Sequence, residues 1–300
     1  MYSLPNIDLI GDSLSRNFHI SSLPSSVLRA KIKHGRDWFL DTNPLTNSIN
    51  SVYERMEKAT PLIATEYASP GGFVDSGVKE SHLFGFLWPL NFSEQVNLIL
   101  RARRFPDLLM IWIGHNNVNW VHNLNAEDRT HPDSFLQRDA ANFRKNYTRQ
   151  LVRLLDKAKD ENHRTAIVVF GLVNFESFFK ARQAAEELKH NNSKLYPYLE
   201  ADYYYFESMK PEYRANMIKL ALMINDELRD MVTEFNLRLG KDSRVSLRYS
   251  DALATVDISQ VDLIHRIDAW HPSAKGHGVL AAAAFNGVEP SLEFLGIAPQ

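Results

Sequence analysis

Residues 107 to 114 read DLLMIWIG, an almost unbroken run of apolar side chains that ends in glycine. A strand with one face in water alternates apolar and polar residues, whereas a parallel strand covered on both faces stays apolar throughout. The run is also far shorter than the roughly 18 apolar residues that a membrane span needs. It therefore predicts a buried strand of a parallel sheet.

Further apolar runs of the same character lie before and after this one. They are NIDLI (6–10), PLIATEY (61–67), TAIVVFGL (165–172) and RVSLRYS (244–250). Apolar side chains at helical spacing occupy 133–161 and the segment that Pro211 opens. This alternation of strands and helices predicts an α/β protein, a three-layer α/β/α sandwich.

The chain shows no linker, repeat or low-complexity tract that would divide it. We therefore expect one domain over 1–300, with excursions near 19–60 and 175–213 that are longer than simple connections. The second excursion is rich in tyrosine. It is either a packed surface segment or the lid or wall of a substrate site.

Composition excludes several classes of function. Lys and Arg number 34 against 36 Asp and Glu, a net charge of −2, so no global field favours nucleic acid or an anionic membrane. The absence of cysteine removes disulfides, thiol catalysis and thiolate metal sites. We expect no transmembrane segment and no signal peptide in this chain. The sequence leaves open whether the protein is cytoplasmic or secreted after loss of a signal, and it leaves the oligomeric state open.

Polar residues follow the predicted strands at the edge where open parallel sheets bind ligands. GDSLS follows the first strand, ASPGG the second and GHNN the third, while DAWHPS follows the last strand near the C-terminus. Each of these loops holds a residue type that acyl transfer uses.

These loops contain the parts of a serine nucleophile site. A serine hydroxyl needs a neutral imidazole to take its proton and a carboxylate to orient that imidazole. Asp268 and His271 lie three positions apart, so the carboxylate can accept from Nδ1–H while Nε2 faces Ser13. The backbone N–H groups of Ser13 and Gly71 and the side-chain amide of Asn116 can bind the oxyanion.

Together the motifs resemble those of SGNH hydrolases, the GDSL esterase/lipase family. GDSLS resembles the first block of that family, EYASPGG the second, IGHNN the third and DAWHPS the fifth, and the blocks occur in family order from residue 11 to 273. The resemblance implies Ser13 as nucleophile, Asp268 and His271 as the other triad members, and Ser13, Gly71 and Asn116 as the oxyanion hole.

The resemblance also implies a flavodoxin-like sandwich, usually of five parallel strands, and ester hydrolysis through an acyl-enzyme without metal or cofactor. The substrate would be a small-molecule or lipid ester. Asn117 stands where the third block usually has aspartate, and Glu66 replaces the asparagine that usually opens the second block. We expect Asp12 to hold the turn beside the nucleophile, while the direction of the His115 side chain is left open.

Other interpretations of the same residues remain. The same triad can pass an acyl group to an alcohol or sugar, which makes an O-acyltransferase. A catalytically silent lipid- or carbohydrate-binding protein is an alternative of another class. His265 or His277 could join His271 in a metal site, but neither spacing matches a known zinc motif, so we predict no metal.

Overall fold

A sheet of five parallel strands lies at the centre of the molecule. The computed structural model describes residues 4–15, 37–41, 49–74, 90–119, 132–192, 194–196, 210–240 and 243–297. The strands are β1 (Asn6–Gly11), β2 (Ile63–Glu66), β3 (Leu108–Trp112), β4 (Thr165–Phe170) and β5 (Val245–Ser250), in the order β2-β1-β3-β4-β5. Every neighbouring pair is parallel.

The strands lie where the apolar runs predict them. Every residue of β3 and β4 is buried, because both strands are interior and covered on both faces. At the edge of the sheet β2 is only four residues long, and its first residue, Ile63, is 53% exposed.

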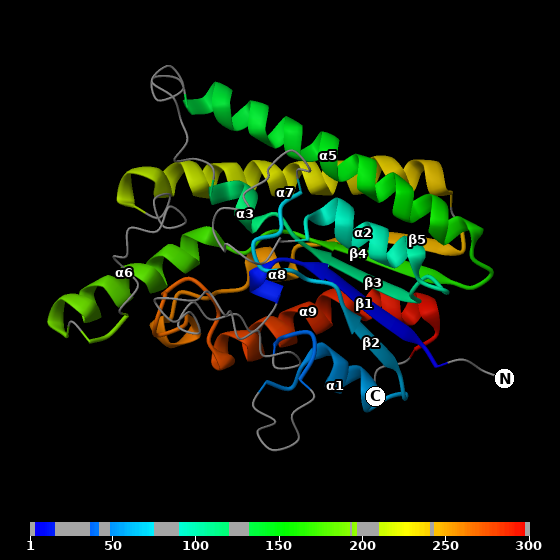
Figure 1. The fold of residues 1–300 in the computed structure, drawn as a ribbon, viewed down its shortest axis with the longest axis horizontal. Coiled ribbons are helices and arrows are strands. Elements are labelled where there is room, and N and C mark those ends of the chain that lie inside the picture. Colours follow the sequence, from blue (N-terminus) through cyan, green and yellow to red (C-terminus); the bar gives the residue numbers. More distant parts are fainter. Residues whose placement is uncertain are drawn as a thin grey trace.

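Helices cover both faces of the sheet (Figure 1). On one face lie α2 (Phe92–Arg101), α5 (Pro132–Asp160) and α7 (Pro211–Leu239), and on the other α1 (Val52–Glu57) and α9 (Ala274–Leu295). Ion pairs join α5 to α7, among them those from Arg144 of α5 to Glu227 and Glu234 of α7. The predicted three-layer α/β/α fold is confirmed.

Short elements and one further helix surround the carboxyl ends of the strands. They are η1 (Ser13–Ser15), α3 (His115–Val118), α6 (Phe175–Asn191), α8 (Ala252–Thr255) and η5 (Val261–Leu263). The excursion near 175–213 thus begins as a helix. Residues 197–209 of that excursion, and 19–36 and 42–48 of the other, lie outside the described residues. No helix of the described part has the length and apolarity to cross a membrane.

The strand order changes direction between β1 and β3. The chain leaves β1 for β2 on one side and then crosses to β3 on the other. In open parallel sheets, ligands bind at the carboxyl ends of the strands at such a switch point. Ser13 directly follows β1 and Asn116 follows β3, so the fold brings the two turns to this position.

Candidate active site

Ser13 opens the 3-10 turn that ends β1. The turn closes when the Ser15 N–H donates to the Asp12 carbonyl, at 3.1 Å. The Leu14 N–H donates to Asp12 Oδ1, also at 3.1 Å, so the Asp12 carboxylate caps the turn from within. Ser13 is almost fully buried. The expectation that Asp12 holds this turn agrees with these contacts.

Gln95 of α2 fixes the last residue of β1. Its Oε1 accepts from the Gly11 N–H at 3.0 Å, and its Nε2 donates to the Gly11 carbonyl at 2.9 Å. The same nitrogen donates to the Leu90 carbonyl at 2.7 Å. The side chain is fully buried and completes the backbone hydrogen bonding just before the turn of Ser13.

Gly71 lies in a tight turn after β2. The Gly72 N–H donates to the Ser69 carbonyl at 3.0 Å, Pro70 holds the second position, and Gly71 has φ of +75°. This is the pattern of a type II turn, in which the third position favours glycine. The hydrogen bond of the turn uses the N–H of Gly72 and not that of Gly71.

The segment after β3 is hydrogen-bonded to the loop after β2. Gly114, at φ +131°, turns the chain into α3. Asn116 Nδ2 donates to the Gly72 carbonyl at 2.9 Å, and Asn117 Oδ1 accepts from the Val74 N–H at 3.1 Å. Asn117 accepts here as an aspartate would.

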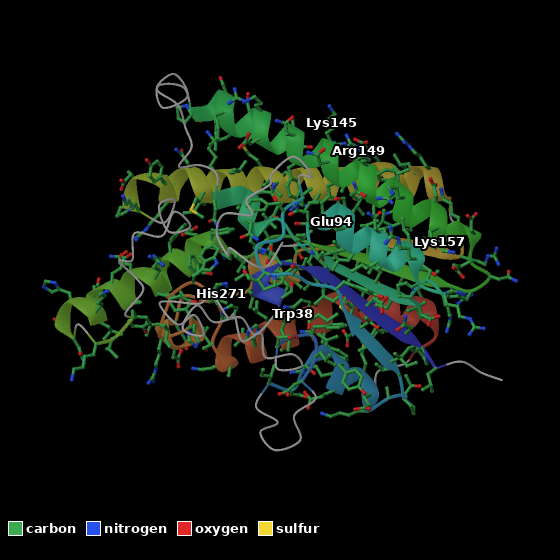
Figure 2. All side chains as sticks on the ribbon, in the orientation of Figure 1. Trp38, Glu94, Lys145, Arg149, Lys157 and His271 are labelled. Atoms are coloured by element: carbon green, nitrogen blue, oxygen red, sulfur yellow. The ribbon has the colours of Figure 1, made fainter. Side chains whose placement is uncertain are left out.

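Asp268 and His271 form a buried carboxylate–imidazole pair. His271 Nδ1 lies 2.8 Å from Asp268 Oδ2. Asp268 Oδ1 accepts from the N–H groups of Trp270, at 2.9 Å, and His271, at 3.1 Å. The structure therefore brings together the two residues as the sequence predicts, with Nδ1 toward the carboxylate. Figure 2 shows the labelled His271 near the sheet end reached by β1.

Electrostatics keep the Asp268 carboxyl ionised. Burial acts to raise its pKa, but the charge and hydrogen bond of His271 outweigh burial, with help from His265 and the Trp270 N–H, and the pKa falls to about 2. A carboxylate with this pKa stays negative at neutral pH, where it can orient the imidazole and stabilise its protonated form.

The loop that carries this pair is tied to the rest of the molecule. The His265 N–H donates to the His271 carbonyl at 2.7 Å, and the Ser273 N–H to the Leu263 carbonyl at 2.9 Å. The Ser273 hydroxyl caps α9 by accepting from the Gly276 N–H at 3.1 Å. Both sides of His271 are therefore anchored.

Arg182 of α6 donates a hydrogen bond to the same loop. Its Nη1 donates to the Ala269 carbonyl at 3.3 Å, and Ala269 itself has φ of +51°, unusual for a residue with a side chain. Burial lowers the pKa of Arg182 to about 10, with Glu186 and Asp268 opposing the change, so the guanidinium is still charged at neutral pH.

Aromatic rings of α6 pack against the residue before His271. The Trp270 ring lies 4.9 Å from the Phe178 ring and 6.0 Å from the Phe175 ring, measured between centroids. The start of the predicted excursion thus forms part of the support of the site. Residues 197–209 of this excursion, where the sequence also allows a lid, lie outside the described part.

A cavity joins the turn of Ser13 to the loop of His271. Leu14, which follows Ser13, and Trp270 and Pro272, which flank His271, line the same apolar cavity. Its volume, taken as the space open to the centre of a water molecule, is about 20 Å³. Within the described residues no hydrogen bond joins the Ser13 hydroxyl to His271, so proton transfer between them stays a prediction.

His277, considered above as a metal ligand, is buried in the first turn of α9. Among the residues that the structure describes, no three histidine or acidic side chains converge as metal ligands would.

Sequence reasoning missed Gln95, Arg182 and the direction of His115. Phe175, Phe178 and Arg182 recur at helical spacing in the sequence, and this spacing would have indicated α6. The structure shows all three side chains buried. For Gln95 and His115 no local signal exists, because their partners lie 84 and 103 positions away.

The chain is similar over most of its length to a solved structure. A lipase from a goat rumen metagenome aligns over 94% of this chain and 97% of its own, with 14% identity and a TM-score of 0.49. No protein-family model matches the chain, and no curated protein matches its sequence. We therefore base the function on the side chains of the site.

Proposed function

We propose that this protein is a serine ester hydrolase of the SGNH type. The observation that supports this most strongly is the buried Asp268–His271 pair, with Nδ1 and Oδ2 2.8 Å apart, on a loop that shares a cavity with the residue after Ser13. The carboxylate occupies Nδ1, which leaves Nε2 as the atom for proton transfer.

In the proposed reaction Ser13 Oγ attacks the ester carbonyl carbon while His271 Nε2 takes the hydroxyl proton. The tetrahedral intermediate collapses, the alcohol leaves with the proton from His271, and an acyl-enzyme on Ser13 remains. Water then attacks the acyl carbon, gives its proton to His271, and releases the acid as Ser13 regains its proton. Asp268 orients the imidazole throughout.

The proposed oxyanion hole combines three loops. The N–H groups of Ser13 and Gly71 and the side-chain amide of Asn116 would donate to the oxyanion. The bonds of Asn116 and Asn117 to Gly72 and Val74 support this assignment, because they hold the second and third loops at a fixed separation. Fixed donors stabilise developing charge without reorganisation.

Substitution of the nucleophile tests this proposal. Ser13→Ala should lower hydrolysis of p-nitrophenyl esters, assayed from acetate to palmitate without added metal, by at least about 10³-fold. Ser15→Ala is the matched control, since Ser15 is a buried serine in the same turn. The chain length hydrolysed fastest will show whether the acyl site is short or lipid-sized.

Covalent labelling provides a second readout. A fluorophosphonate should modify the wild type and Ser15→Ala at Ser13, and should leave Ser13→Ala unmodified. A Ser13→Ala protein that folds, as judged by its thermal melting, and still turns over esters would disprove the proposal.

A further inference from the structure

A second buried carboxylate–imidazole pair lies beside the proposed nucleophile. His115 Nδ1 is 2.8 Å from Asp12 Oδ2, and the side chains of the two residues are 1% and 0% exposed. Asp12 immediately precedes Ser13, and His115 immediately precedes Asn116. The pair therefore connects the turn of the proposed nucleophile to the turn of the proposed oxyanion donor.

A backbone contact indicates the tautomer of His115. The Val173 N–H donates to His115 Nε2 at 3.2 Å, so that nitrogen acts as the acceptor. The proton of the neutral ring is then on Nδ1, which donates to Asp12. Because Nε2 is occupied, His115 is not placed to accept the proton of Ser13.

The Asp12 carboxylate receives donors from both turns. Its Oδ1 accepts from the Leu14 N–H at 3.1 Å. Its Oδ2 accepts from the N–H groups of Gly114, at 3.3 Å, and His115, at 3.2 Å, as well as from the ring of His115. The ring bond is the shortest of these four contacts. All four are charge-assisted, because they donate to the same carboxylate.

Packing fixes the plane of the His115 ring. Trp112 lies against it edge-on, with centroids 4.6 Å apart, and Phe175 lies at 6.4 Å. Trp112 is itself held by a bond from its Nε1 to the Gly171 carbonyl, at 2.9 Å. The ring can therefore direct its Nδ1–H at one oxygen of Asp12 without sampling other rotamers.

We propose that His115 is a positioning residue of the esterase reaction: by donating to Asp12 it holds Ser13 in register with the oxyanion turn at 114–116. This inference rests on the proposed function. Small displacements of a nucleophile from its attack geometry lower the rate steeply. The bond of His115 to Asp12 therefore contributes to turnover and not only to folding.

Two substitutions separate the two contacts of the ring. The amide nitrogen of His115→Asn lies where Nδ1 lies, so this variant keeps the donor to Asp12 and loses the acceptor for Val173. The amide oxygen of His115→Gln lies where Nε2 lies, so this variant keeps the acceptor and loses the donor. Both remove the ring and its packing against Trp112.

We expect His115→Gln to lower kcat by about ten- to a hundredfold and to leave KM within about threefold. His115→Asn should restore kcat to within about threefold of the wild type. His163→Asn, at a partly exposed histidine beside Asp107, is the control for the substitution itself. The thermal midpoint of each variant is measured alongside, because a role in folding alone predicts that kcat follows stability in both variants.

Equal kcat in the two His115 variants, whether both high or both low, overturns the inference. If His115→Gln does not fold, Asp12→Asn decides, because it weakens the same contact from the other side: a fall in kcat of about tenfold or more supports the inference, and an unchanged kcat overturns it. Ser13→Ala is assayed in parallel. If it is inactive while His115 variants behave as wild type, only this inference fails; if it is active, the proposed function fails and this inference with it.

Discussion

Two aspartate–histidine pairs in this protein have the same contact but different surroundings. In each pair the Nδ1 to Oδ2 distance is 2.8 Å and both side chains are buried. Asp268 and His271 lie three positions apart on one loop, whereas Asp12 and His115 are separated by 103 positions. The second pair uses its Nε2 for the Val173 N–H.

The difference teaches that the carboxylate–imidazole contact does not by itself identify a general base. The contact fixes the tautomer and the ring orientation in both pairs. The chemistry depends on the partner of the other ring nitrogen. A backbone N–H at Nε2 makes His115 a structural connector, and a serine hydroxyl facing Nε2 would make His271 a base.

The largest expected effect concerns His271, the histidine of the two pairs that is proposed as the general base. His271→Ala should lower kcat by at least about 10³-fold, because the proposed proton acceptor is removed. The measurement is p-nitrophenyl acetate hydrolysis at neutral pH with the thermal midpoint recorded for each protein. His163→Ala, at a partly exposed histidine beside Asp107, serves as control. A His271→Ala enzyme with near-normal kcat would assign the base elsewhere.

A smaller effect is expected at the carboxylate of the same pair. Asp268→Asn keeps the volume but presents an amide N–H to Nδ1, which favours the tautomer with the proton on Nε2. We expect kcat to fall by at least about 10²-fold with KM changed much less. The steady-state constants of this variant, taken beside those of Asp133→Asn at an exposed position, test the role of Asp268. Equal activity of the two variants would contradict it.

Within the described residues, Asp8 is a buried aspartate without the histidine partner that Asp12 and Asp268 have, and we expect its effect on the stability of the fold. Asp8 of β1 has no histidine partner among the contacts that determine its pKa, and burial raises that pKa to about 7, although hydrogen bonds from Thr65 and Asn6 oppose the change. Because the pKa of Asp8 is higher in the folded protein than in the unfolded chain, the protonated carboxyl stabilises the folded state. This contribution to the free energy of unfolding is fully present at a pH below the pKa of the unfolded chain, and it is lost as pH rises through about 7.

Asp8→Asn should therefore remove part of the pH dependence of unfolding. Between pH 4 and pH 8 the wild type should lose, through this group, on the order of 4 kcal/mol of unfolding free energy that the variant keeps. Urea unfolding at several pH values measures this, and the esterase activity of the variant at neutral pH should change least of all. Parallel pH profiles for the two proteins would show that Asp8 is not the titrating group.

The sequence predicts those features that depend on neighbouring residues. Continuous apolar runs indicated the strands, and helical spacing indicated α5 and the helix that begins at Pro211. Asp268 and His271 were found together because they share one loop. The structure places His271 Nδ1 2.8 Å from Asp268 Oδ2. The catalytic roles of Asp268 and His271, like those of Ser13, Gly71 and Asn116, remain predictions.

Contacts between distant segments could not be predicted in this way. Arg182 reaches the carbonyl of Ala269 across 87 positions, and Gln95 reaches Gly11 across 84. Neither spacing carries a signal, because these contacts exist only after the sheet has placed the helices. The helix α2 was not predicted either, since a ten-residue amphipathic segment offers few turns of periodicity.

The separation of Ser13 and His271 along the chain also has a consequence for biosynthesis. Ser13 follows the first strand, β1, whereas the loop of His271 precedes α9. From Ser13 to His271 the ribosome adds 271 − 13 = 258 residues. At roughly 5 to 20 residues per second, this takes about 13 to 50 s. A nascent chain carries Ser13 for that whole interval without His271, so the proposed acyl-transfer site can form only after the loop of His271 has been synthesised.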